Sequence, residues 1–170
     1  MYDTRKLRKL TALIKKYSVH EIRVLPMDKK REFKNRDQVD NFFRSGFIAD
    51  GRYYYQKRGI KIRRPHALIL FQYDNQITAY AILEEAVPLK DIGERPYTAV
   101  VNGHRIKYHG YYQFYPDSIQ RTRDITAEEL RNTVDGFRRF SQSKQFIEIK
   151  YMKALCKLLS RKRMAFEKDA

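Results

Sequence analysis

The stretch ALILFQYDNQITAYAIL, residues 67–83, is the most informative part of the sequence for the fold. Its first part, Ala67 to Phe71, is a short apolar run typical of a buried strand. Asp74 and Asn75 are turn residues, and Ile77 to Leu83 is predicted as a second strand. We therefore expect two neighbouring strands of one sheet at the centre of the chain.

The sequence around this stretch predicts more strands. Residues 52–57 contain three consecutive tyrosines and are predicted to be extended. Tyr97 to Val101 and His104 to Tyr108 flank Asn102-Gly103, a pair that adopts the positive φ angles of a tight hairpin turn. Gly110 to Tyr115 is expected to form a further strand.

Helical patterns lie on both sides of this β-rich middle. Residues 3–17 repeat apolar side chains at helical spacing, with Asp3 or Thr4 as the cap. A short strand is expected at 20–25, and a helix at 36–45 that Gly46 ends. Thr126 and Glu129 form a capping-box pattern before a helical face of Leu130, Val134, Phe137 and Phe140, and a last helix is expected at 147–160.

The order of these elements predicts one α+β domain over residues 1–170. We expect a basic helical region at about 1–46, a β-rich core at about 47–120 and C-terminal helices at about 121–160. Strands joined by hairpins favour a small antiparallel or mixed β-barrel with flanking helices. A doubly wound parallel sheet is disfavoured, because helices do not alternate with the central strands.

Charge indicates the kind of partner. The chain carries 36 Lys and Arg against 20 Asp and Glu, a net charge of +16, which favours polyanions such as DNA or RNA. The charge is also segregated. Residues 1–36 hold 12 basic and 4 acidic side chains, a net charge of +8, whereas residues 73–94 hold 1 Lys and 5 acidic side chains, a net charge of −4.

The segment RYYYQKRGIKIRR, residues 52–64, interleaves aromatic and basic side chains and contains no acidic residue. Cations hold phosphates, and aromatic faces stack on unpaired bases. In a strand Tyr53 and Tyr55 share one face and Tyr54 lies on the other. If one face packs into the core, one or two of these tyrosines stay available to a ligand.

This segment resembles an element of the PUA-like superfamily, which includes the ASCH, EVE and YTH domains. The resemblance rests on Gly59-Ile60-Lys61-Ile62-Arg63-Arg64 before the strand 67–71, on the strand 77–83 and on Tyr111-Tyr112-Gln113-Phe114. It covers about residues 45–160 and implies a small β-barrel with flanking helices. It also implies nucleic-acid binding, in some branches with a modified base in an aromatic pocket; a pocket in this chain must use Tyr or Phe, since there is no Trp.

We hypothesise that an unstacked base enters a pocket between the two tyrosine clusters while arginines hold its phosphates. DNA and RNA remain alternatives, and the oligomeric state is open. The candidate nucleic-acid-binding residues are Arg52, Tyr53, Tyr55, Lys57, Arg58, Lys61, Arg63, Arg64, Tyr111 and Tyr112.

Two other functions stay open at this point. Asp117, Glu148 and Lys150 match the letters of a PD-(D/E)xK metal-dependent nuclease, although we favour a turn and a solvated face for them. A protein-interaction module would bind an acidic partner through the same basic surface. The four histidines and Cys156 show no metal-ligand spacing, so we expect no metal, no cofactor and no catalytic residue. No apolar run is long enough to span a bilayer, and we expect a cytoplasmic location.

Overall fold

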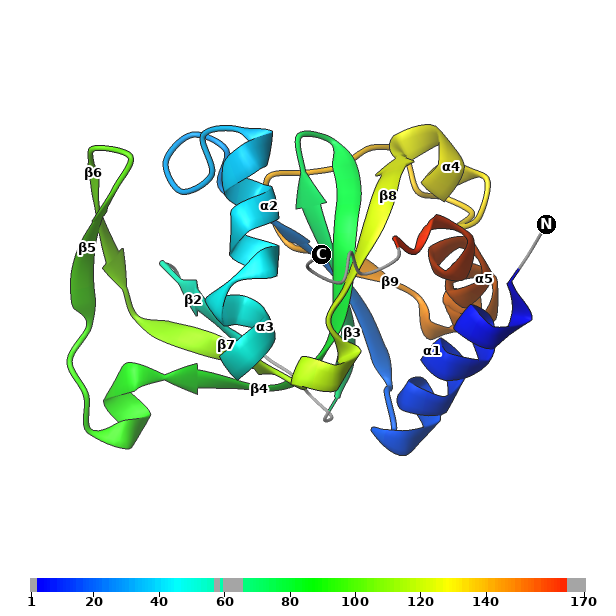
Figure 1. Ribbon diagram of the computed structural model, residues 1–170, viewed down its shortest axis with the longest axis horizontal. Helices are drawn as coiled ribbons and strands as arrows, with labels where there is room; N and C mark the ends of the chain where they lie inside the picture. Colours follow the sequence, from blue (N-terminus) through cyan, green and yellow to red (C-terminus); the bar gives the residue numbers. More distant parts are fainter. Residues whose placement is uncertain (1–2, 57–58, 60–65, 165–170) are drawn as a thin grey trace, which may run out of the picture.

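The computed structural model describes residues 3–56, 59 and 66–164, and Figure 1 shows their arrangement. Most of the predicted binding segment, residues 57–58 and 60–65, lies outside the described residues. The elements are α1 (Thr4–Lys16), β1 (Glu21–Pro26), α2 (Arg36–Arg44), α3 (Gly46–Asp50), β2 (Arg52–Tyr55), β3 (Ala67–Tyr73), β4 (Gln76–Pro88), η1 (Leu89–Ile92), β5 (Tyr97–Val101), β6 (His104–Tyr108), β7 (Gly110–Phe114), η2 (Pro116–Ser118), β8 (Gln120–Thr126), α4 (Ala127–Arg131), β9 (Gln145–Ile147), η3 (Ile149–Tyr151) and α5 (Met152–Lys162).

A seven-stranded mixed sheet forms the centre of the molecule, with six strands in the order β2-β7-β4-β3-β1-β9 and the seventh, β8, paired with β4. Strands β1 and β3 are parallel, and the other pairs are antiparallel. The long strand β4 pairs with β3 along one side and with both β7 and β8 along the other. The predicted α+β class and the predicted strands 67–71 and 77–83 are confirmed.

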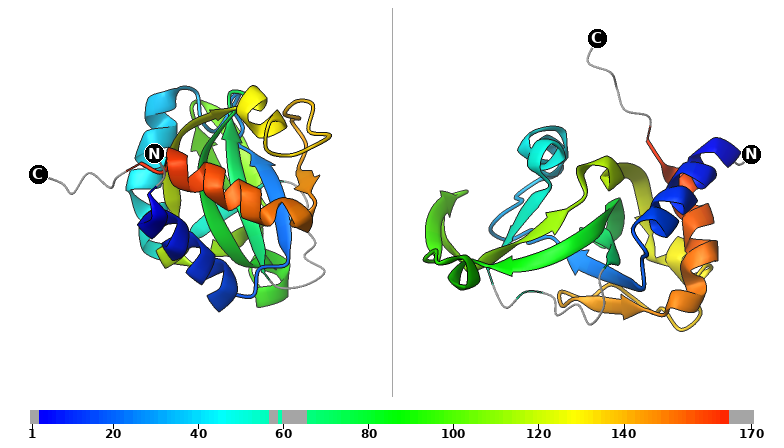
Figure 2. Two further views of the ribbon diagram at one scale, coloured as in Figure 1. Left: turned by 90° about the vertical axis from the view of Figure 1, so that its right-hand side faces the viewer. Right: turned by 90° about the horizontal axis from the view of Figure 1, so that it is seen from below.

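Strand β3 is buried along its whole length because helices cover both faces of the sheet. Ile69 and Phe71 point into one core, where they pack with Phe43 of α2 and Phe47 of α3. Leu68 and Leu70 point into a second core, which includes Leu10 of α1 and several residues of α5. Figure 2 shows α1 and α5 side by side over this second face. Because helices cover both faces of the sheet at β3, the sequence of this strand is a continuous apolar run.

The predicted barrel is not confirmed, because the sheet is open. Its end strands β2 and β9 are not paired with each other in the described part of the chain. The bulge in β4 between Leu83 and Glu85, and its change of partner from β8 to β7, bend the sheet without closing it. Strand β2 is therefore an edge strand.

The hairpin β5–β6 forms a separate two-stranded sheet that extends from the end of the main sheet, at the left of Figure 1. Its turn is the predicted one: Asn102 and Gly103 both have positive φ, 50° and 77°. The register pairs Tyr97 with Tyr108 at the base of the hairpin and Val101 with His104 at its tip.

The C-terminal part differs from the prediction. The capping box of Thr126 and Glu129 is present, but α4 ends at Arg131 rather than continuing through Phe140. Val134 and Phe140 still reach the second core from an irregular segment in which Gly136 has a positive φ of 81°. Residues 120–126 and 145–147, expected within the helical region or outside any strand, form β8 and β9.

Cys156 is buried in the second core, as expected for a small apolar side chain, and burial raises the pKa of its thiol to about 11. Among the described helices, none is long and apolar enough to cross a membrane.

Candidate nucleic-acid interface

The pairing of β2 with β7 brings the two predicted tyrosine clusters together. Tyr53 lies opposite Tyr112, Tyr54 opposite Tyr111, and Tyr55 opposite Gly110. Alternation along β2 then sends Tyr53 and Tyr55 to the same side, as the sequence predicts, and both are buried in the first core.

Three of the predicted base-binding residues are buried in this structure and cannot contact a base. Tyr53, Tyr55 and Tyr112 are 6%, 7% and 0% exposed. Their rings pack on one another and on Phe71, with Tyr55 and Tyr112 centroids 4.8 Å apart. Because stacking needs a free ring face, these three side chains stabilise the core and leave no face for a base.

The opposite face of β2 keeps Arg52 and Tyr54 partly accessible. The guanidinium of Arg52 lies 4.6 Å from the ring centroid of Tyr111, a cation–π contact across the β2–β7 pair. Tyr111 is itself 9% exposed, so it supports Arg52 rather than presenting its own ring. Lys57, Arg58, Lys61, Arg63 and Arg64 lie outside the described residues.

A pocket lies between this edge strand and the hairpin β5–β6. Its volume is about 220 Å³, smaller than the roughly 300–1,000 Å³ of pockets for drug-sized ligands. A site of this size suits one planar ring system. The lining is mostly aromatic and consists of Glu32, Phe33, Phe42, Arg52, Tyr53, Tyr54, Tyr97, Val101 and Tyr108. A different pocket, beside α1, has a volume of about 290 Å³.

Three tyrosines form the aromatic cluster of this pocket. The ring centroid of Tyr54 lies 5.3 Å from that of Tyr97 and 6.0 Å from that of Tyr108, and Tyr97 and Tyr108 are 5.3 Å apart. Tyr97 is 42% exposed, so its ring is accessible from solution. We call Tyr54, Tyr97 and Tyr108 the tyrosine cluster.

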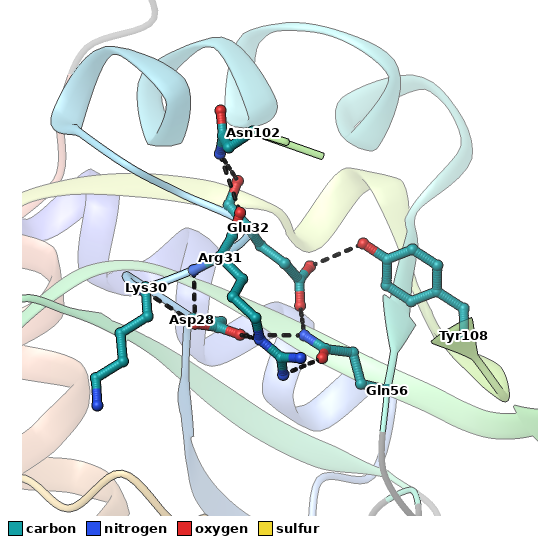
Figure 3. A network of polar contacts seen from close by, with 7 residues as sticks. All are labelled: Asp28, Lys30, Arg31, Glu32, Gln56, Asn102 and Tyr108. Atoms are coloured by element: carbon teal, nitrogen blue, oxygen red, sulfur yellow. Dashed lines mark hydrogen bonds and ion pairs between the residues drawn. The ribbon is translucent and has the colours of Figure 1, made fainter. Parts of the chain in front are cut away.

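Glu32 supplies the carboxylate of the pocket, and Figure 3 shows the polar network that holds it. The Tyr108 hydroxyl donates to Glu32 Oε2 at 3.2 Å, and Gln56 Nε2 donates to Glu32 Oε1. Gln56 Nε2 also donates to Asp28 Oδ2 at 3.2 Å. Burial, more than any neighbouring charge, raises the pKa of Glu32 above its ordinary value.

The hairpin tip is attached to the loop that carries Glu32. Asn102 Nδ2 donates to the carbonyl oxygens of Arg31 and Glu32 at 3.1 and 3.2 Å, and Gln38 Nε2 donates to Asn102 Oδ1 at 2.7 Å. These bonds attach the tip of the hairpin to the loop before α2 and to Gln38 of α2. The Asn-Gly turn thus fixes the pocket as well as the hairpin.

Sequence reasoning missed most of this pocket. Tyr97 and Tyr108 are the first and last residues of the predicted hairpin, so its two-residue turn already implies that they pair. That register was the available signal for them. Glu32 lies in a charged loop next to other charged residues, and nothing in the sequence distinguishes it.

The three residues that match the nuclease pattern, Asp117, Glu148 and Lys150, do not form one site: Asp117 bonds to Tyr17, whereas Glu148 and Lys150 pair with each other. Asp117 lies in η2, and its two carboxylate oxygens are 2.8 and 2.9 Å from the Tyr17 hydroxyl that donates to them. Glu148 pairs with Lys150 at 3.4 Å, and both are largely exposed. Within the described ranges, no group of three or more His, Cys, Asp or Glu side chains is placed to hold a metal ion.

Comparison with known proteins gives structural matches only. No protein-family model and no curated protein matches the chain. Its structure is similar to the crystal structure of ASCH from Zymomonas mobilis, with 11% identity, a TM-score of 0.48 and coverage of 83% of this chain and 97% of that one. Two variants of the same ASCH protein match with 10% and 12% identity and TM-scores of 0.49 and 0.48.

Proposed function

We propose that this chain binds single-stranded nucleic acid and that the pocket beside β2 accepts one unstacked base. The observation that carries the proposal is the tyrosine cluster: Tyr54, Tyr97 and Tyr108 are among the residues that line one pocket, and Tyr97 is accessible from solution. A base offers its ring face to a side chain only when it is unpaired, so a single strand or an extruded nucleotide is the ligand.

We expect Arg52 at the pocket and basic side chains farther along the chain to supply the phosphate contacts. Arg52 lies in the pocket wall, and Arg105 and Lys107 are exposed on the hairpin, on the face opposite to Tyr108 and Ile106. Residues 57–64 include basic but no acidic side chains. In the sequence they directly follow Gln56, which bonds to Glu32. This combination of stacking surface and cations is typical of single-strand binding.

The test is a binding panel of single- and double-stranded DNA and RNA with wild type and Tyr97→Ala. Tyr97→Ala should weaken single-strand binding by about 1–3 kcal/mol, the contribution of one stacked base. Its melting temperature should stay close to that of wild type, because Tyr97 is an exposed side chain. Tyr97→Phe should bind almost normally if stacking is the interaction.

Phe146→Ala is the matched control, since Phe146 is an exposed aromatic of β9, the opposite edge strand of the sheet. It should leave affinity unchanged. Equal loss in both variants, or no loss in Tyr97→Ala, contradicts the proposal. Binding confined to acidic proteins, with no affinity for any nucleic acid, would favour an interaction module instead.

A further inference from the structure

Glu32 gives the pocket a chemical preference that stacking alone lacks. Among the described residues that line the pocket, Glu32 is the one with a carboxylate, and it lies on the loop before α2. Among the described residues, Gln56 donates a hydrogen bond to Oε1 of Glu32 and Tyr108 donates one to Oε2. An ionised carboxylate has about four acceptor sites, so each oxygen retains one for a ligand.

The remaining acceptor sites demand donors from the ligand. The Tyr108 hydroxyl already donates its hydrogen to Glu32. The side-chain amide of Asn102 already donates to the carbonyl oxygens of Arg31 and Glu32. A ligand that brought another acceptor next to the carboxylate would leave both groups unpaired and desolvated, which is costly.

We propose that Glu32 makes the pocket selective for guanine, whose N1–H and exocyclic N2–H₂ are adjacent donors on one edge. The inference rests on the proposed function, because it concerns the base that the same pocket accepts. Two parallel N–H donors match the two oxygens of one carboxylate. Adenine and cytosine place a ring-nitrogen acceptor beside their amino group, and uracil flanks its single N–H with two carbonyls, so each turns an acceptor toward Glu32.

The surroundings of Glu32 fit this role. Gln56 and Tyr108 fix the position of the carboxylate, and Gln56 is itself held by Asp28, which accepts from its Nε2 at 3.2 Å. Figure 3 shows Gln56, the residue after β2, and Tyr108 of β6 converging on Glu32. A ligand therefore meets a carboxylate of defined orientation, which is what discrimination between base edges requires.

The experiment uses the full chain and short single-stranded RNA probes that differ only in one central base: guanine, inosine, adenine, cytosine or uracil. Inosine keeps N1–H and lacks the N2 amino group. Wild type should bind the guanine probe on the order of 10- to 100-fold more tightly than the inosine probe, the change expected for one hydrogen bond to a charged group. Glu32→Gln should lose this preference, because its amide presents a donor to the base.

Glu128→Gln is the control, since it makes the same change of charge on an exposed residue of α4 and should keep the preference. Wild type alone decides the point if Glu32→Gln does not fold: equal binding of guanine and inosine probes overturns the inference. If Tyr97→Ala still weakens binding in that case, the base pocket stands and only its selectivity is wrong. If Tyr97→Ala has no effect, both proposals fail.

Discussion

The buried position of Glu32, which we propose contacts a base, carries a cost in stability. Burial in the pocket disfavours its charged form, and its pKa is therefore raised from the ordinary value of 4.5. The hydrogen bonds from Gln56 and Tyr108 act in the opposite direction, and the charges that face it are those of Asp28 and Arg31. Since the first cause dominates, folding favours the protonated form of this side chain.

This raised pKa predicts how stability changes with pH. The contribution of Glu32 is fully present below its unfolded value of 4.5 and is lost as pH rises through the higher folded value. Glu32→Gln cannot titrate at this position. The free energy of unfolding of wild type should therefore fall relative to that of Glu32→Gln as the pH rises above 4.5 in urea titrations. A difference that is constant or rises with pH would show that the carboxylate is stabilised as an anion.

The candidate site was predictable in part from its residues. The period of two along β2 correctly separates Tyr53 and Tyr55 from Tyr54, but the sequence does not say which face is the core. The choice depends on α2 and α3, whose Phe43 and Phe47 cover one side of the sheet. Glu32 reaches the pocket only through the folded path of its loop, and a single sequence contains no local signal for such a contact.

Gly110 shows how tightly β2 and β7 are packed. It lies opposite Tyr55, and a Cβ atom at this position would come 2.1 Å from the Tyr55 hydroxyl oxygen and 2.6 Å from the Val87 carbonyl oxygen. The Tyr55 ring therefore occupies the space that any larger residue needs. The two strands that carry the tyrosine clusters can pair in this register only with glycine at position 110.

Gly110→Ala should destabilise the protein by about 1–3 kcal/mol or more, the usual cost of overpacking, because the Val87 backbone cannot easily move away. Thermal or urea unfolding measures this loss. Gly46→Ala is the matched control: no atom lies within 4 Å of its added Cβ, and it is the first residue of α3. It should be neutral or stabilising by about 0.4–1 kcal/mol. Similar losses in both variants would mean that the close contact at Gly110 is relieved at no cost.

Elements with strong local signals were predictable, and elements defined by tertiary contacts were not. The Asn-Gly hairpin and the capping box of Thr126 have the predicted geometry. The sequence does not predict strand β8, because two of its buried residues, Gln120 and Thr122, are polar and interrupt an apolar pattern. Beyond α4, Val134 and Phe140 are spaced as on a helix, yet they fill the second core from an irregular segment.

At the scale of the molecule, basic side chains gather at two places that Figure 1 shows at opposite ends of the sheet. One is the hairpin and β2 beside the pocket, with exposed Arg52, Arg105 and Lys107. The other is the pair of helices α1 and α5, with exposed Arg5, Arg8, Lys153 and Lys157. A net charge of +16 alone does not distinguish them, since any cation attracts a polyanion at long range.

Salt dependence separates contact from long-range attraction. Each phosphate neutralised on a single strand contributes about 0.7 to the slope of log affinity against log salt concentration. Arg105→Ala should therefore reduce the magnitude of the wild-type slope by about 0.7 and weaken all sequences to a similar extent. Arg8→Ala on α1 removes the same charge from an exposed position away from the pocket and should leave the slope unchanged. If Arg8→Ala reduces the slope and Arg105→Ala does not, the nucleic acid lies on α1 and α5. Phosphate binding would then be separate from the tyrosine cluster.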